Sequence, residues 1–77
     1  MFEKIRDILA EQLFVQPETI RPDSRIKEDL GADSLDILQL LMTLEETSGA
    51  VIPDEELATF QKVSDIMDYL ESRGIQL

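Results

Sequence analysis

Ser34 stands between two carboxylates, in the segment 31–36 (Gly-Ala-Asp-Ser-Leu-Asp), where a loop is expected to end and a helix to begin. A serine becomes nucleophilic when a neighbouring base, usually histidine, takes its proton. The chain contains no histidine and no cysteine. The sequence therefore argues against a catalytic Ser34 and against a catalytic thiol, and the serine requires another explanation.

A metal site is the first alternative, because acidic residues crowd around Ser34. They are Glu28, Asp29, Asp33 and Asp36. Their spacing does not fit a calcium-binding EF-hand: counted from Asp29, ligand position 3 is Gly31, and position 6, where glycine is required, is Ser34. We therefore expect no metal site, with weak binding of divalent cations as the alternative. The chain also has no glycine-rich phosphate loop and no basic patch for nucleic acid.

The charge of the chain is strongly and unevenly negative. Seventeen acidic residues oppose seven basic ones, for a net charge of −10. Nine of the acids fall between Lys27 and Lys62, where there is no lysine or arginine. Such a surface repels nucleic acid and anionic lipid and speeds the encounter with basic protein patches. The alternative is that the charge serves solubility only.

Length and composition bound the class of protein. Seventy-seven residues suffice for one small core, so we expect a single domain over residues 1–77. The first residues lack the features of a signal or transit peptide, and no apolar run approaches the roughly 18 residues needed to cross a membrane. The absence of cysteine fits a reducing compartment. We therefore expect a cytoplasmic protein.

Hydrophobic periodicity predicts a first helix from Glu3 to about Leu13. Its inner face consists of Ile5, Ile8, Leu9 and Leu13. Phe14 follows where glycine would more naturally close a helix, so we expect an ordinary packing contact or an exposed ring there and no regular cap. From Gln16 to Asp33, prolines, a glycine and short polar residues predict a long loop. This loop either lacks regular structure or contains one helical turn at residues 17–20.

A second helix is predicted from about Ser34 to Ser48, because Asp33 is a suitable N-cap and no glycine or proline follows until Gly49. The residues expected on its core face are Ile37, Leu40, Leu41 and Leu44. A second apolar strip lies on the Ser34 side of the helix and consists of Leu35, Leu38 and Met42. The surplus strip indicates either a docking surface or a helix buried between two neighbours.

Two further helical segments are expected before the end of the chain. A short helix has Asp54 as its candidate cap and Leu57 and Phe60 pointing inward. A last helix is expected from Val63 to about Arg73, closed by Gly74. Together these segments predict an all-α fold, a small four-helix bundle of three main helices and one short helix, with a long loop between the first and second helices.

The segment 28–36 (Glu-Asp-Leu-Gly-Ala-Asp-Ser-Leu-Asp), the leucine-rich stretch through 44–46 (Leu-Glu-Glu) and the segment 52–56 (Ile-Pro-Asp-Glu-Glu) closely resemble the acyl carrier proteins of type II fatty acid synthesis. The resemblance covers essentially the whole chain, and the combined motif is highly specific. It implies a carrier that catalyses nothing. Ser34 would hold 4′-phosphopantetheine, transferred from coenzyme A by a dedicated phosphopantetheinyl transferase (holo-synthase) with magnesium. Growing acyl chains would then travel on its thiol as thioesters.

The resemblance also implies partners, namely the transferase, ketoacyl synthases, malonyl transferase and other fatty acid synthesis enzymes with basic docking patches. These enzymes would bind this chain as a monomer. The chain itself would neither bind nucleic acid nor insert into a membrane. The partner-binding residues would be Asp33, Leu35, Asp36, Leu38, Met42, Glu45 and Glu46. The acyl chain would be sheltered by residues that are equally well ordinary core residues: Ile26, Leu30, Leu40, Leu44, Ile52, Leu57, Phe60, Ile66 and Tyr69.

Physical chemistry bears on the attachment point that the resemblance implies. A phosphodiester on the first residue of a helix meets free backbone N–H groups and the positive end of the helix dipole. Asp33 and Asp36 oppose its charge, so we expect the phosphate not to be clamped and the arm to stay mobile.

Several positions depart from the common pattern of the resembled family. Gln39 stands where glutamate is usual, and Phe14 stands where glycine is usual. The segment 48–51 (Ser-Gly-Ala-Val) stands in place of a stretch that in the family typically contains a phenylalanine and further acidic residues. Leu57 and Phe60 are also bulkier than usual, which would narrow an acyl cavity. A dedicated polyketide or aminoacyl carrier is therefore an alternative to the fatty acid carrier. The alternative from another class is an unmodified acidic protein-interaction module.

Overall fold

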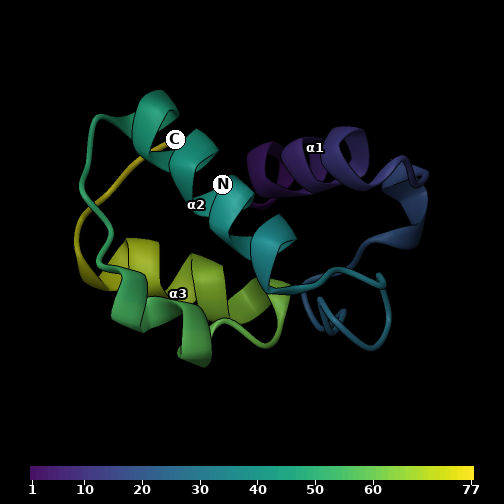
Figure 1. Cartoon of the computed structure of the whole chain (residues 1–77). Helices are drawn as coiled ribbons and strands as arrows, with labels where there is room; N and C mark the ends of the chain where they lie inside the picture. The colour runs from purple at the N-terminus through teal and green to yellow at the C-terminus, as the bar shows by residue number, and fades with distance from the viewer.

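The computed structural model describes all 77 residues, and every regular element in it is a helix. Three α-helices surround one core (Figure 1), and these are α1 (Phe2–Leu13), α2 (Ser34–Ser48) and α3 (Val63–Ser72). Two 3₁₀ helices, η1 (Pro17–Thr19) and η2 (Asp54–Thr59), lie in the connections. The predicted all-α bundle is confirmed, and the long loop contains the short helical turn. None of the helices combines the length and the apolar character that a membrane span requires.

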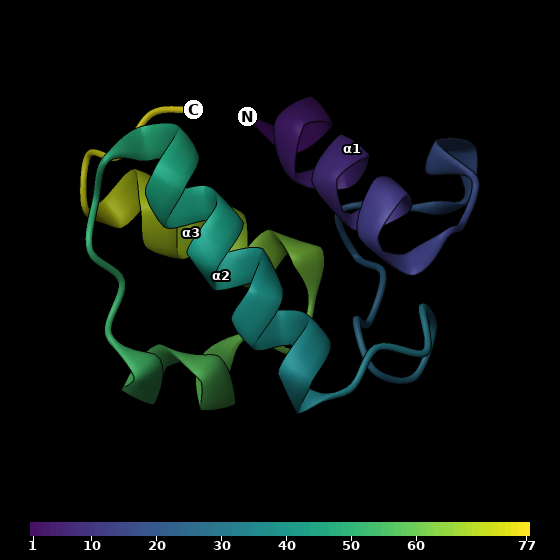
Figure 2. The same ribbon diagram turned by 45° about the horizontal axis from the view of Figure 1, so that its top comes forward.

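The central element of the bundle is α2. In Figure 1, α1 lies on one side of α2, with η2 and α3 on the other, and in Figure 2 α3 lies behind α2. The predicted core face of α2 is buried in full, as Ile37, Leu40, Leu41 and Leu44. It packs against buried side chains of the neighbouring helices, among them Ile5, Leu9, Val63, Ile66 and Leu70. Burying one such side chain stabilises a fold by about 1.5–3 kcal/mol, so packing supports these short helices more than intrinsic propensity does.

The end of α1 differs from the prediction. Phe14 caps the helix in the left-handed conformation, with φ 58° and ψ 42°, and its N–H donates to the Ala10 carbonyl. The Val15 N–H donates to the same carbonyl at 3.1 Å, which is a Schellman-type ending. The expectation of no regular cap is therefore wrong, because Phe14 adopts the conformation that usually requires glycine. The exposed ring is confirmed, since 95% of Phe14 is accessible to solvent.

Backbone hydrogen bonds tie the long loop to the start of α3. The Ile26 N–H donates to the Gln61 carbonyl at 2.8 Å, and the Val63 N–H donates to the Ser24 carbonyl at 3.1 Å. The Ile26 side chain is fully buried, so it also fastens the loop to the core. The segment that leads into Ser34 is therefore anchored to the bundle.

The connection from α2 to α3 follows the prediction with one exception. Gly49 ends α2 in the left-handed conformation, with φ 76°. Pro53 is the cap residue of η2, so the prediction of Asp54 as the cap is wrong. Asp54 instead lies in the first turn, where its carboxylate interacts favourably with the positive end of the helix. Phe60 is buried as predicted and meets the Tyr69 ring edge-on, with the ring centroids 5.6 Å apart.

Candidate functional site

The first turn of α2 is held by two reciprocal hydrogen bonds. The Asp36 N–H donates to the Asp33 carboxylate at 3.0 Å, and the Asp33 N–H donates to the Asp36 carboxylate at 3.1 Å. This capping box typically stabilises a helix by about 0.5–2 kcal/mol. The two acids on either side of Ser34 therefore have a structural role, which fixes the backbone on which the serine stands.

Ser34 is the first residue of α2 and is exposed to solvent. Its hydroxyl makes no hydrogen bond within the protein, and the cap around it is formed by the two aspartates. The Ser34 and Leu35 N–H groups also have no partner in the protein, whereas the next one, of Asp36, is capped. A free hydroxyl can accept a covalent group, and the free N–H groups beside it can stabilise negative charge on that group.

A hollow opens beside the Ser34 side chain, between the start of α2, the long loop and η2. Its volume is about 270 Å³, and its other lining residues are Lys27, Ile37, Leu57 and Ala58. A second hollow of about 270 Å³ shares Lys27, Leu57 and Ala58 with the first, so the two hollows adjoin. Ser34 thus stands at the edge of two adjoining hollows, whose walls combine apolar side chains with Gln61, one cation, Lys27, and one anion, Glu28.

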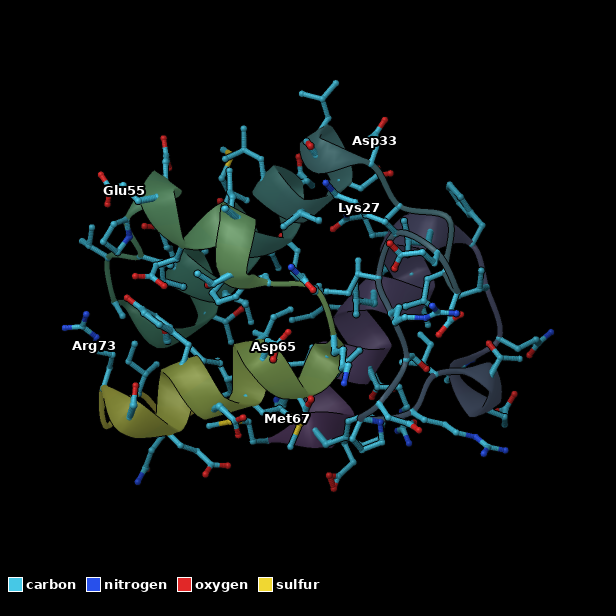
Figure 3. All side chains as sticks on the ribbon, turned by 90° about the horizontal axis from the view of Figure 1, so that it is seen from below. Lys27, Asp33, Glu55, Asp65, Met67 and Arg73 are labelled. Carbon is cyan, nitrogen blue, oxygen red and sulfur yellow. The ribbon has the colours of Figure 1, made fainter.

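Lys27 is the basic residue of these hollows. Figure 3 shows the Lys27 and Asp33 side chains at the same end of the molecule, beside the start of α2. The two ion pairs of the chain are Arg6 with Asp7 and Arg25 with Asp29, so Lys27 belongs to neither. Lys27, Ile37 and Ala58 were not predicted from the sequence as neighbours of Ser34. The available signal for Lys27 was that it is the last cation before the acidic stretch.

Asp29 shapes the loop that leads into the site. Its carboxylate accepts the Arg25 N–H at 2.8 Å and forms an ion pair of 3.0 Å with the Arg25 guanidinium. These hydrogen bonds, from the side chain first and the backbone second, lower the pKa of Asp29 below its ordinary value. The turn that they close is followed by Gly31, whose φ of 74° turns the chain toward Asp33. Asp29 thus shapes the loop that leads to Ser34, and its hydrogen bonds are to Arg25 and not to the serine.

The predicted docking strip lies on the surface of α2. Leu35 is 74% exposed, Met42 is 48% exposed and Leu38 is partly buried. Exposed apolar side chains that form a contiguous patch, unlike single scattered ones, indicate a site of interaction with another molecule. Because the core face of α2 is already buried, the strip is in excess of what the fold requires.

The two glutamates predicted to bind partners have different surroundings. Glu46 is exposed and makes no hydrogen bond through its side chain. The Glu45 carboxylate instead accepts the Ile52 N–H at 2.8 Å, which fastens the loop after α2. Glu45 therefore has a structural function that the sequence analysis did not anticipate.

The residues predicted to shelter an acyl chain divide into two groups. Ile26, Leu40, Leu44, Ile52, Phe60 and Ile66 are buried in the core, and Leu30, Leu57 and Tyr69 are partly buried. The hollows beside Ser34 reach only two of the nine, Leu57 and Phe60. Of the other seven, five are buried in the core, and Leu30 and Tyr69 pack against it.

A wider groove of about 430 Å³ lies between α1 and α2. It is lined by Ile8, Glu11, Gln12, Phe14, Gln39 and Thr43. Two of these, Phe14 and Gln39, are positions that depart from the pattern of the resembled family.

Comparisons with known proteins agree with this geometry. The model of the phosphopantetheine attachment site family matches residues 3–70. The acyl carrier protein of Campylobacter hominis is 47% identical over 72 residues, which cover 94% of this chain and 91% of that protein. The acyl carrier protein of Thermosynechococcus vestitus is 44% identical over 73 residues, covering 95% and 90% of the two chains. A crystal structure of a free-standing peptidyl carrier protein from a secondary metabolic pathway of Acinetobacter baumannii has a TM-score of 0.81 at 28% identity, covering 94% of this chain and 89% of that chain.

Proposed function

Because this chain belongs to the phosphopantetheine attachment family, as one of its acyl carrier proteins, we propose that the Ser34 hydroxyl carries the 4′-phosphopantetheine group. The observation that supports this assignment is the Ser34 side chain itself, exposed and without a hydrogen-bond partner at the start of α2. The free Ser34 and Leu35 N–H groups suit a phosphodiester at this position. When bound, the group supplies the thiol on which acyl chains are carried as thioesters.

In the proposed attachment, Ser34 is the acceptor in a reaction that another protein catalyses. The Ser34 oxygen forms a bond to the phosphorus of the pantetheine phosphate in coenzyme A, and the pyrophosphate bond breaks. The serine proton passes to a base of the transferase, and 3′,5′-ADP leaves. This chain has no histidine or cysteine to activate its own serine, so the transferase must supply the base. The proposal thus makes the chain a substrate of enzymes rather than an enzyme.

The proposed docking surface for partners is the exposed part of α2. Leu35, Leu38 and Met42 supply its apolar centre, and Asp33, Asp36 and Glu46 surround it with negative charge. Aspartate carboxylates that are already hydrogen-bonded in the capping box keep further lone pairs for arginine and lysine side chains of a partner. We therefore place Glu46 and the two aspartates at the polar rim of the interface. We assign Glu45 a structural role instead, as the acceptor of the Ile52 N–H.

The cargo and the partners complete the proposal. We assign the chain to fatty acid synthesis in the cytoplasm, where a phosphopantetheinyl transferase, ketoacyl synthases and malonyl transferase would bind it as a monomer. The likeness to a free-standing peptidyl carrier protein favours a second candidate, a dedicated carrier of aminoacyl or related cargo. Both candidates use the same serine and differ in the enzyme that loads the thiol.

The attachment is tested by intact-mass measurement. The protein is incubated with coenzyme A, magnesium and a broad-specificity phosphopantetheinyl transferase, and we expect the mass to rise by one phosphopantetheinyl group. Ser34→Ala should abolish the gain, whereas Ser72→Ala, at an exposed serine in the last turn of α3, should not. No gain in the wild type, or a gain that survives Ser34→Ala, contradicts the assignment.

The cargo is tested on the loaded protein. Malonyl transferase with malonyl-coenzyme A should add a malonyl group to the fatty acid carrier. Amino-acid-activating enzymes should instead load the dedicated carrier. Preferential aminoacyl loading would replace the fatty acid assignment without affecting Ser34.

A further inference from the structure

We propose that Lys27 attracts the phosphodiester of the prosthetic arm and thereby favours a resting place for the arm in the adjoining hollows beside Ser34. This inference rests on the proposed attachment at Ser34. Ser34 and Lys27 line the same hollow of about 270 Å³, although they come from different elements, the start of α2 and the loop before it. A phosphate joined to the Ser34 oxygen is therefore within the space that the lysine side chain borders.

The charges around Ser34 make Lys27 the residue suited to this role. Asp33 and Asp36 lie on either side of the serine and repel a phosphodiester. The Lys27 ammonium group has no carboxylate partner, since neither ion pair of the chain includes it. No other lysine or arginine follows until Lys62. Lys27 is thus free to offset the repulsion and to attract the phosphate toward its own side of Ser34.

The walls of the hollows suit the remainder of the arm. Ile37, Leu57 and Ala58 are apolar and border the hollow next to the serine. The pantetheine segment nearest to the phosphate carries two methyl groups on one carbon, which such walls would remove from water. The second hollow adds polar groups at Glu28 and Gln61, which suit the amides farther along the arm.

Lys27 therefore sets a balance between two positions of the arm, one lying along η2 and one extended toward a partner. Because Lys27 and Ser34 are both exposed, the attraction between the lysine and a phosphate on the serine would be that of a surface ion pair and not of a permanent clamp. A partner with its own arginine or lysine side chains would compete for the phosphate and release the arm. The arm thus stays mobile, as expected from the two aspartates, but it rests preferentially on the Lys27 side of Ser34.

The experiment compares amide chemical shifts of the apo and phosphopantetheinylated protein by NMR, together with the ³¹P relaxation of the arm. In the wild type we expect the attachment to shift the Ile37 and Ala58 amides. Lys27→Gln should lower the ratio of docked to extended arm by roughly two- to fivefold, the range expected for one exposed ion pair. High salt should have the same effect on the wild type.

Two matched variants control this measurement. Lys4→Gln removes an exposed lysine of α1 that lines none of the hollows, and its shifts should match those of the wild type. Lys27→Arg should retain docking, because it keeps the charge. Thermal melting of each variant shows whether the fold is intact.

The outcomes separate the two proposals. If the intact mass shows attachment at Ser34 but Lys27→Gln leaves the shifts and the ³¹P relaxation unchanged, the lysine contact is overturned and the attachment stands. Absence of shifts at Ala58 on attachment overturns the resting place. If no group can be attached to Ser34, both proposals fail.

Discussion

The side-chain amide of Gln12 donates a hydrogen bond of 2.6 Å to the backbone carbonyl of Asp36. This bond joins the last turn of α1 to the first turn of α2, across 24 positions of sequence. It therefore supports the turn that carries Ser34 from the side opposite η2. Together with the capping box, it explains how an exposed serine is held on a rigid backbone.

Replacement of Gln12 by alanine is predicted to destabilise the protein by about 1 kcal/mol, because a partly buried hydrogen bond is lost. Urea denaturation monitored by circular dichroism measures the change. Gln16→Ala is the control, since the Gln16 side chain is exposed and makes no hydrogen bond. Equal stability of both variants and the wild type would show that the bond contributes nothing.

Phe14→Gly is predicted to stabilise the protein by about 0.5–1 kcal/mol. Glycine removes the cost of about 1–2 kcal/mol that a left-handed backbone imposes on other residues, and its own entropy cost of about 0.5–1 kcal/mol offsets part of the gain. The ring contributes little burial, since it is exposed. Phe14→Ala is the control, because it deletes the ring and keeps the strained Cβ. Stabilisation by both substitutions alike would locate the effect in the ring.

Asp29→Asn is predicted to destabilise the protein at neutral pH and to have no effect in strong acid. The pKa of Asp29 is lowered in the folded state by its hydrogen bonds from Arg25, so the charged carboxylate stabilises the fold above its unfolded pKa of ~4. That stabilisation is lost as the pH falls through the lowered folded pKa. Melting temperatures of the two proteins should converge there, whereas Asp23→Asn, at an exposed loop aspartate, should follow the wild type throughout.

The helices could be predicted from the sequence because their determinants are local. The bounds of α2, Ser34–Ser48, follow from Asp33 as the cap and Gly49 as the terminator. The buried face of α2 follows from the 3.6-residue period. Ser34 could also be singled out, because the residues that identify it are its neighbours in the segment 28–36.

The rest of the site could not be predicted, because it depends on contacts between distant segments. The Gln12 bond to Asp36 and the hollow that Lys27 shares with Leu57 arise only when the elements pack. At the end of α1, two hydrogen bonds to the Ala10 carbonyl accompany a Phe14 backbone conformation that its side chain disfavours. At such a position the intrinsic preference of the residue predicts a backbone conformation other than the left-handed one.

The neighbouring glutamates of α2 are predicted to respond differently to substitution. Glu45→Ala should lower the free energy of unfolding by about 1–2 kcal/mol, because the Ile52 N–H loses a charged acceptor in a partly buried place. Glu46→Ala should leave stability within about 0.5 kcal/mol of the wild type and weaken binding to a basic partner. Denaturation curves and calorimetric titration with the transferase separate the two effects. Equal losses of stability would contradict the distinction.

Leu35→Ala is predicted to weaken recognition by partners without loss of stability. Leu35 is 74% exposed, so its truncation removes little buried area in the free protein and should change the unfolding free energy by less than about 0.5 kcal/mol. As the apolar residue next to Ser34, it should be central to a docked partner, where truncation of an anchor costs about 1–2 kcal/mol. The kcat/KM of the phosphopantetheinyl transferase for the apo protein should then fall roughly 5- to 30-fold.

Val51→Ala is the matched control for Leu35, because Val51 is also an exposed aliphatic residue, at 84%, but lies in the loop between α2 and η2. Its substitution should change neither the stability nor the kcat/KM. A loss of similar size in both variants would mean that general surface hydrophobicity governs recognition. A loss confined to Leu35 places the docking surface on α2, next to the serine that it presents.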